Sequence, residues 1–260
     1  MRSVRPVAVA YLCFALVLST SAQQANAPPV QAPALLQSAL AALAGANSVS
    51  DVTLTGTARR IAGSDDETGT AVLKAITGAT RVDLTLPSGQ RTEIINISGG
   101  QFAGRWIGTD GVSHAVADHN LLLIDPGWFF PAFPVARGLS SGYLATYVGP
   151  ETRDSIAVQH LFISQQPADT SDTAALLQHL SQVDLYLDSS TLLPVAMTFY
   201  IHPDDNAMLD IPVEIRFSDY RPVNGVQVPF HVQKFLNNGL ILDLQFQSAL
   251  LNSGLSASAF

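Results

Sequence analysis

The chain has 260 residues, a formal net charge of −8 and only 13% charged residues, against an average of about 25% in globular proteins. The shortage of Lys and Arg argues against nucleic acid and against electrostatic docking on anionic lipid, since both need clustered basic residues. Apolar residues reach 47%, which suits a large core, an apolar cavity, or both.

Residues 1–22 have the pattern of a secretory signal peptide. Basic residues precede an apolar run, residues 6–18, that is too short to span a bilayer. Small residues before Gln23 predict cleavage after Ala22. Cleavage after Ala27 would place a proline directly after the cut, which disfavours it. The pattern predicts a protein exported to the periplasm or secreted.

The predicted mature chain contains no cysteine, because Cys13 lies inside the apolar run. Its stability must therefore come from burial rather than from disulfides. Residues 23–32 are rich in Pro, Ala and Gln and predict a flexible leader. Residues 33–260 then form one domain, in which no further apolar run reaches membrane-spanning length.

The domain starts with a helical pattern over residues 33–46, where Pro33 suits a first turn and Gly45 suits a stop. Leu36, Leu40 and Leu43 form its apolar stripe. From Val52 onward the apolar period drops to two, which predicts strands. The strand candidates before the second predicted helix are residues 51–60, 70–76, 80–86, 92–97, 101–108, 143–149 and 155–164.

The second helix is predicted over residues 172–182, with Leu176, Leu177 and Leu180 on one face. Five half-buried strands follow, each alternating apolar and polar residues. They are residues 183–188, 195–202, 211–218, 226–232 and 240–247.

This order of elements has no βαβ alternation and predicts a mainly β (α+β) fold. A single antiparallel sheet of roughly ten strands, with one apolar face and only two short helices to cover it, must curl around them. We therefore expect an unclosed half-barrel with short helices on its concave side.

The connection between the last two strands predicts their register. A turn at Asn238-Gly239 would set Val232 against Gln245, whereas a three-residue loop pairs Val232 with Leu244. By the same count, the longer loop pairs Phe230 with Phe246. Since opposed residues share a face of the sheet, the pattern favours a loop over residues 237–239, with Gly239 at positive φ.

Two motifs in the last third resemble the LolA/LolB-like superfamily of periplasmic lipoprotein-carrier folds. One is "LYLDSSTLLPVAMTF" (185–199), a strand, an Asp, a turn, Leu-Pro and a second strand. The other is "FSDYRPVNGVQVPFHVQKF" (217–235), with Tyr220, an Asn-Gly turn and Pro229 at similar spacing. The resemblance implies an unclosed β-barrel with helical lids over a hydrophobic cavity that receives acyl chains. It implies no catalytic constellation.

The segment "LIDPGWFFPAF" (123–133) gathers four aromatic residues between prolines that forbid a regular strand. Its rings either plug the core or edge an apolar cavity, and in a half-barrel the two alternatives overlap. If the segment is a lid, it should be less stable than the strands. The predicted cavity and lid residues are Trp128, Phe129, Phe130, Phe133, Leu36, Leu40, Phe199, Phe217, Phe230 and Phe246.

Other motifs favour surface turns over chemistry. "GLSSG" (138–142) matches a nucleophile elbow around Ser140, but an elbow needs a strand before it and a helix after it. No histidine pair has the helical spacing of a metal site; His114 and His119 lie in a loop-like run. The acidic clusters at 64–67 and 203–206 lack the pattern of a calcium loop. We therefore expect no metal, no cofactor and no catalytic residues.

The sequence thus favours an exported binding or carrier protein for a lipid, lipoprotein or other apolar ligand. The alternative is a protein-interaction or sensor module of the same fold at the cell envelope, without ligand transfer. A hydrolase built on Ser140 is the third hypothesis.

Overall fold

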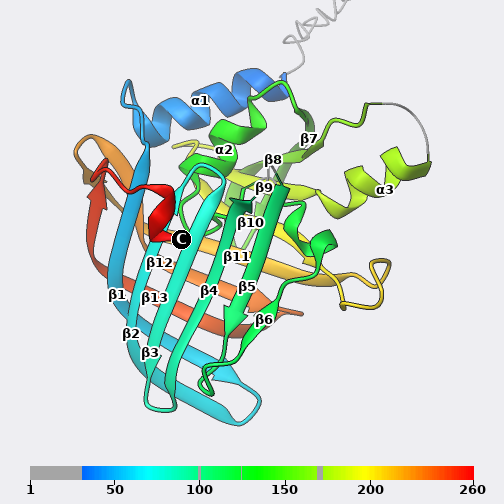
Figure 1. Ribbon diagram of the computed structural model, residues 1–260. Coiled ribbons are helices and arrows are strands. Elements are labelled where there is room, and N and C mark those ends of the chain that lie inside the picture. The colour runs from blue at the N-terminus through cyan, green and yellow to red at the C-terminus, as the bar shows by residue number, and fades with distance from the viewer. Residues whose placement is uncertain (1–30, 99–100, 124, 169–171) are drawn as a thin grey trace, which may run out of the picture.

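The computed structural model describes residues 31–98, 101–123, 125–168 and 172–260 (Figure 1). The predicted signal peptide and nearly all of the predicted leader lie outside these residues. The described chain forms one antiparallel sheet that does not close into a barrel, accompanied by three α-helices. The predicted fold class is therefore confirmed, with thirteen strands in place of roughly ten.

The strands follow one another in the sheet almost as they do in the chain. They are β1 (Asp51–Ala62), β2 (Asp65–Ile76), β3 (Ala79–Leu86), β4 (Gly89–Ser98), β5 (Gln101–Ile107), β6 (Ser113–Ala115), β7 (Tyr143–Arg153), β8 (Ile156–Gln165), β9 (Val183–Asp188), β10 (Pro194–Ile201), β11 (Ile211–Val223), β12 (Val226–Leu236) and β13 (Gly239–Leu251). All twelve predicted strand segments correspond to strands. Only β6, which is three residues long, has no counterpart, because so short a strand shows no period.

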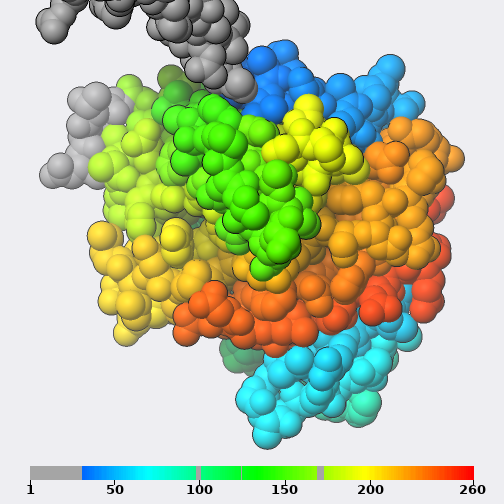
Figure 2. Space-filling view, turned by 180° about the vertical axis from the view of Figure 1, so that it is seen from behind, coloured from blue at the N-terminus to red at the C-terminus, as the bar shows by residue number. Residues whose placement is uncertain are grey.

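The order of the strands places the first and the last side by side. It runs β6-β5-β4-β3-β2-β1-β13-β12-β11-β10-β9-β8-β7, so the central pair is β1 and β13 and the edge strands are β6 and β7. Figure 2, seen from behind, shows the orange and red C-terminal strands lying between the cyan N-terminal strands and the green and yellow middle of the chain. The segment between the two edge strands holds the 3-10 helix η1 (Asp118–Leu121) and helix α2 (Ala132–Gly138).

Helix α1 (Ala32–Ala44) has the predicted ends. Pro33 lies in its first turn, and Gly45 stops it with φ 59° and an N–H donated to the carbonyl of Ala41 at 2.8 Å. Figure 1 shows α1 and α2 lying together across one end of the curved sheet, and α1 contacts α2, β7 and β12. Leu36 and Leu43 are fully buried there.

Helix α2 was not predicted, because its sequence contains Pro134. A proline is compatible with the first turn of a helix, where its missing N–H has no acceptor in the helix, and Pro134 is the third residue of α2. Helix α3 (Asp172–Leu180) confirms the other predicted helix. Its three leucines do not share a buried face, since Leu180 is buried whereas Leu176 is exposed.

The turn between β12 and β13 corrects the predicted three-residue loop. Leu236 pairs with Gly239, so the turn contains only Asn237 and Asn238, at φ 48° and 64°. Positive φ at both central residues is the geometry that matches the twist of paired strands, and Asn tolerates it. Gly239 is not among the residues with positive φ.

A bulge explains why the predicted register holds despite the shorter turn. The pairing shifts between Lys234 and Phe235, which leaves Ile241 as an extra residue in β13. Val232 therefore faces Leu244, as predicted. A three-residue loop and a two-residue turn with a bulge both add the same single residue between the paired strands, so they put the same residues opposite each other. The alternation of apolar residues therefore could not distinguish the two.

Candidate ligand-binding cavity

A cavity of about 650 Å³ opens at one end of the curved sheet. Residues of β1, β3, β4, β5, β12 and β13 line it, together with Trp128 from the segment before α2. Its size lies within the range of small-molecule sites, about 300–1,000 Å³. Most of its lining is apolar: Ile61, Ala62, Val82, Leu84, Trp106, Ile107, Trp128, Leu236, Leu240, Ile241 and Leu242.

Several charged side chains in the cavity lie on the face of the sheet that elsewhere forms the core. The alternation of side chains along each strand places them there. In β12, Lys234 has the same parity as the buried Val232, and it pairs with Leu242 of β13. In β1, Arg60 has the parity of the buried Ala58. The apolar stripe of each strand thus ends in a cation where the strand reaches the cavity.

Strand β4 adds a third cation by the same rule. Arg91 pairs with Leu84, a buried residue of β3, so the two side chains share the core face. Glu93, two residues further along β4, also lines the cavity. The lining therefore carries three cations and one anion. Among the described residues, no carboxylate lies within ion-pair distance of Arg60, Arg91 or Lys234.

Two buried N–H groups in the cavity wall have no acceptor among the described residues. They are Nε of Arg91 and the indole Nε1 of Trp128. The Nζ of Lys234 lies 4.7 Å from the centre of the Trp128 ring, over its face, which is cation–π geometry. The cavity therefore combines apolar walls with unpaired donors and positive charge, and it can accept a ligand that carries an acceptor or an anion at one end.

The remaining aromatic residues of the segment 123–133 lie behind Trp128 in the core. Phe129 and Phe130 are fully buried, and Phe133 is nearly so. The rings pack edge to face, with centroids 5.6 Å apart for Trp128 and Phe129 and 5.1 Å apart for Phe130 and Phe133. Trp128 is thus the one aromatic side chain of this segment in the cavity lining.

A buried carboxylate fixes the start of the aromatic segment. Asp125 accepts hydrogen bonds from the backbone N–H of Gly127 at 2.8 Å and of Gly78 at 3.3 Å. A cation also lies beside it: Arg137 Nη2 of α2 is 3.7 Å from Asp125 Oδ2. Burial raises the pKa of Asp125 to about 6, and the two N–H donors and Arg137 only partly offset this. Asp125 therefore ties the segment to the β2–β3 turn and to α2.

Comparisons with known proteins agree with this architecture. No family model and no curated protein matches the sequence. Among solved structures, a LolA superfamily protein from Nitrosomonas europaea superposes with a TM-score of 0.54 at 14% identity, covering 89% of this chain and 97% of that one. A domain assigned to an outer membrane lipoprotein-sorting protein from Vibrio parahaemolyticus gives 0.53 at 14% identity, with 87% and 94% covered.

The chain has the LolA-superfamily fold. A DUF1329 family protein from Desulfovibrio piger shares the fold at 11% identity, with a TM-score of 0.54 and 88% and 97% of the two chains covered. At these identities the likeness concerns the fold alone. In the described residues of this LolA-type sheet and its helices, no helix is long and apolar enough to cross a membrane.

Of the ten residues predicted to line the cavity, only Trp128 is in its lining. The other nine belong to the hydrophobic core or pack against it. Leu40 is partly buried against the core. The remaining members of the predicted set are buried in it: Phe129, Phe130, Phe133, Leu36, Phe199, Phe217, Phe230 and Phe246.

Sequence reasoning missed the cations and Trp106. The available signal was parity, because Lys234 and Arg60 occupy positions where alternation calls for an apolar residue. Trp106 pairs with Glu93 in the sheet, and its ring stacks on His114 at 4.0 Å, with half of its surface exposed. Both tryptophans of the chain thus line the same cavity.

The motifs set aside in the sequence have no catalytic geometry around them. Ser140 follows helix α2 and precedes strand β7, the reverse of a nucleophile elbow, and its Oγ donates to the carbonyl of Arg137 at 2.7 Å. His114 stacks on Trp106, whereas His119 Nε2 lies 3.1 Å from the carbonyl of Pro203. His114 and His119 therefore contact different residues.

Proposed function

We propose that this chain is an exported binding or carrier protein for an amphiphile, a molecule with an apolar body and an acidic or hydrogen-bond-accepting head. The observation that carries the proposal is the pair of buried, unpartnered donors, Arg91 Nε and Trp128 Nε1, in an otherwise apolar cavity. The fold supports a carrier function, since one protein that shares it is named for lipoprotein sorting and another for the LolA superfamily. The N-terminal pattern supports export.

The free energies favour a ligand with a head group over a plain hydrocarbon. A buried donor without an acceptor costs about 1–3 kcal/mol, and more when the group is charged. A hydrocarbon would fill the apolar part of the cavity and leave both donors unpaired. A carboxylate or a phosphate would accept from them after a local shift of the side chains that cover the two buried atoms, and would also lie close to the charges of Arg60 and Lys234. The cavity therefore favours a ligand with an acidic or hydrogen-bond-accepting head group in addition to an apolar body.

The experiment uses the two tryptophans. Trp106→Phe leaves Trp128 as the single tryptophan of the protein, so its emission reports on the cavity alone. We expect a long-chain fatty acid to shift this emission saturably, because the indole N–H gains an acceptor and the head group replaces the ring as the partner of Lys234. The matched fatty alcohol has the same chain without the charge and should bind at least about tenfold more weakly, which corresponds to about 1.4 kcal/mol.

Charge variants separate head-group binding from chain binding. Arg91→Gln and Lys234→Gln should each remove most of the preference for the acid over the alcohol. Lys74→Gln is the matched control, since Lys74 lies between the buried Leu73 and Ala75 of β2 and therefore on the outer face of the same sheet. An emission that stays unchanged with both ligands would contradict the proposal. So would equal affinity for acid and alcohol.

A further inference from the structure

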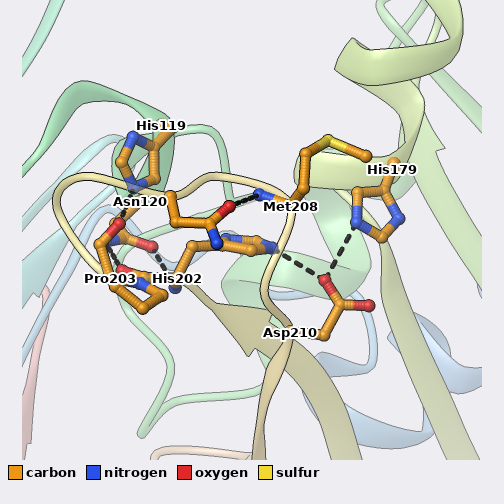
Figure 3. A network of polar contacts seen from close by, with 8 residues as sticks. His119, Asn120, His179, His202, Pro203, Met208 and Asp210 are labelled. Atoms are coloured by element: carbon orange, nitrogen blue, oxygen red, sulfur yellow. Dashed lines mark hydrogen bonds and ion pairs between the residues drawn. The ribbon is translucent and has the colours of Figure 1, made fainter.

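A second cluster of polar side chains lies away from the cavity, where α3, the 3-10 helix η1 and the β10–β11 connection meet (Figure 3). His179 is in the last turn of α3, His202 follows β10, and Asp210 precedes β11. Asp210 Oδ1 lies 3.0 Å from His179 Nε2 and 3.1 Å from His202 Nε2. The three donor atoms lie within 4.8 Å of one another. A single carboxylate oxygen thus faces two imidazole nitrogens.

The position of His202 is fixed from behind. Asn120 of η1 donates its side-chain N–H to the carbonyl of His202 and accepts the backbone N–H of His202, both at 2.8 Å. His119 Nε2 lies 3.1 Å from the carbonyl of Pro203. The side chain of His202 is 1% exposed, whereas those of His179 and Asp210 are about one-third exposed. The cluster therefore has one rigid, buried member and two members that reach solvent.

We propose that His179, His202 and Asp210 form a binding site for a divalent transition-metal ion of the zinc class. Two imidazoles and one carboxylate are a ligand set that zinc accepts, with a fourth position left for water. Imidazole also selects for such metals over magnesium and calcium, which prefer oxygen ligands only. The two nitrogens and the oxygen already converge, and the half-exposed side leaves an entry path. This site is independent of the proposed amphiphile cavity.

The observed distances fit such an ion with a small adjustment. Zinc bonds of about 2.0–2.1 Å to nitrogen and 2.0–2.2 Å to oxygen, in tetrahedral geometry, put ligand atoms about 3.3 Å apart. The two nitrogen–oxygen distances here, 3.0 and 3.1 Å, need only a slight expansion. His179, whose side chain is about one-third exposed, can supply the remaining movement, because His202 is held by Asn120.

The state of the buried ring agrees with a ligand role. Burial lowers the pKa of His202, which favours the neutral form of the ring. A metal ligand must be neutral imidazole. Nδ1 of His202 is buried and has no hydrogen-bond partner among the described residues. No contact at Nδ1 therefore favours the tautomer of the free ring over the tautomer that binds a metal through Nε2.

A bound ion would join elements that few other contacts connect. It would tie the C-terminal end of α3 to both ends of the β10–β11 connection, residues 202–210. The expected consequence is that the ion slows amide hydrogen exchange in α3, since opening this helix would then require loss of a ligand.

The test is calorimetric titration of the full mature chain, without an affinity tag, using zinc after removal of metals with a chelator. We expect one ion per chain. His179→Gln and Asp210→Asn should each weaken binding at least about tenfold, the lower end for changes around a metal site. Both residues are partly exposed, so these variants should fold, which circular dichroism checks.

His231→Gln is the matched control. Its Nε2 lies 2.8 Å from Asp243 Oδ1, and its side chain is 30% exposed against 32% for His179, but no second histidine shares its carboxylate. Zinc affinity should be unchanged in this variant. Zinc should slow exchange in α3 of the wild type and of His231→Gln, but not in His179→Gln or Asp210→Asn. Affinity weaker than about 1 mM would overturn the proposal. So would undiminished zinc binding by His179→Gln or by Asp210→Asn.

Discussion

Asp125 gives this protein an unusual dependence of stability on pH. Most carboxylates with shifted pKa values here have lowered ones, because a hydrogen bond or a cation stabilises the charge, as at Asp66 and Asp188. Asp125 is the opposite case, with its pKa raised to about 6 by burial. Between its unfolded pKa of 3.8 and its folded pKa, the native state binds more protons than the unfolded state.

The sign and size follow from this difference. Because the folded pKa is raised, the cost of burying the charge is fully present above pH 6 and disappears as the pH falls toward 3.8. The full shift corresponds to about 3 kcal/mol. Between pH 7.5 and pH 5 the linkage relation gives a gain of about 1 kcal/mol in the free energy of unfolding. The contribution of Asp125 thus makes the protein more stable in mild acid.

Urea denaturation of the wild type and of Asp125→Asn at pH 7.5, 6 and 5 isolates this contribution, since asparagine cannot titrate there. We expect the free energy of unfolding of the wild type to rise by about 1 kcal/mol relative to the variant between pH 7.5 and pH 5. The other titrating groups are common to both proteins and cancel. A difference that stays constant within about 0.3 kcal/mol over this range, or that changes in the opposite direction, would refute the assignment of a raised pKa.

Two further predictions concern the core and the serine. Phe230→Ala and Phe246→Ala should each lower the free energy of unfolding by about 3–5 kcal/mol, because both rings are buried in the main core; denaturant midpoints equal to that of the wild type would contradict this. Ser140→Ala should leave any esterase activity of a preparation unchanged, because Ser140 lies between a helix and a strand in the wrong order for an elbow; activity lost in a folded variant would show otherwise.

The sheet could be predicted because its information is local. A period of two over five or more residues survives in every long strand, and the parity of Val232 and Leu244 set their register even though the turn itself was wrong. Helix α1 was equally visible from Pro33, its leucine stripe and Gly45. Short elements without a period, such as β6, and a helix that contains Pro134 gave no such signal.

The cavity could not be predicted in the same way, because it depends on which strands become neighbours. Lys234 and Trp128 are 106 positions apart in the sequence, yet the ammonium lies over the indole ring. Nothing in the local pattern around Lys234 separates a cavity residue from a strand end that simply reaches water. The same is true of the cluster at Asp210, whose two histidines come from different elements. Such sites become visible only after the sheet order and the connections are known.

The burial of the aromatic segment limits how it could take part in the proposed binding. A lid that swings open as a unit would expose Phe129 and Phe130, which are fully buried. Each phenylalanine buries about 150–250 Å², so exposing one costs roughly 4–6 kcal/mol at 25 cal/mol per Å². Opening both would use up most of the stability of an ordinary domain, about 5–15 kcal/mol. Asp125 and α2 hold the two ends of the segment as well.

Entry of the proposed amphiphile would therefore use smaller movements than a swinging lid. Trp128 projects from this anchored segment into the cavity, and Lys234 covers the face of its ring. A cation–π contact contributes about 0.5–2 kcal/mol. The interactions of a bound head group can offset the loss of a contact of this size. Lys234 would exchange the ring for an anion, and Trp128 would gain an acceptor for its N–H. Phe129 and Phe130 would stay buried during this exchange and would hold the segment in place.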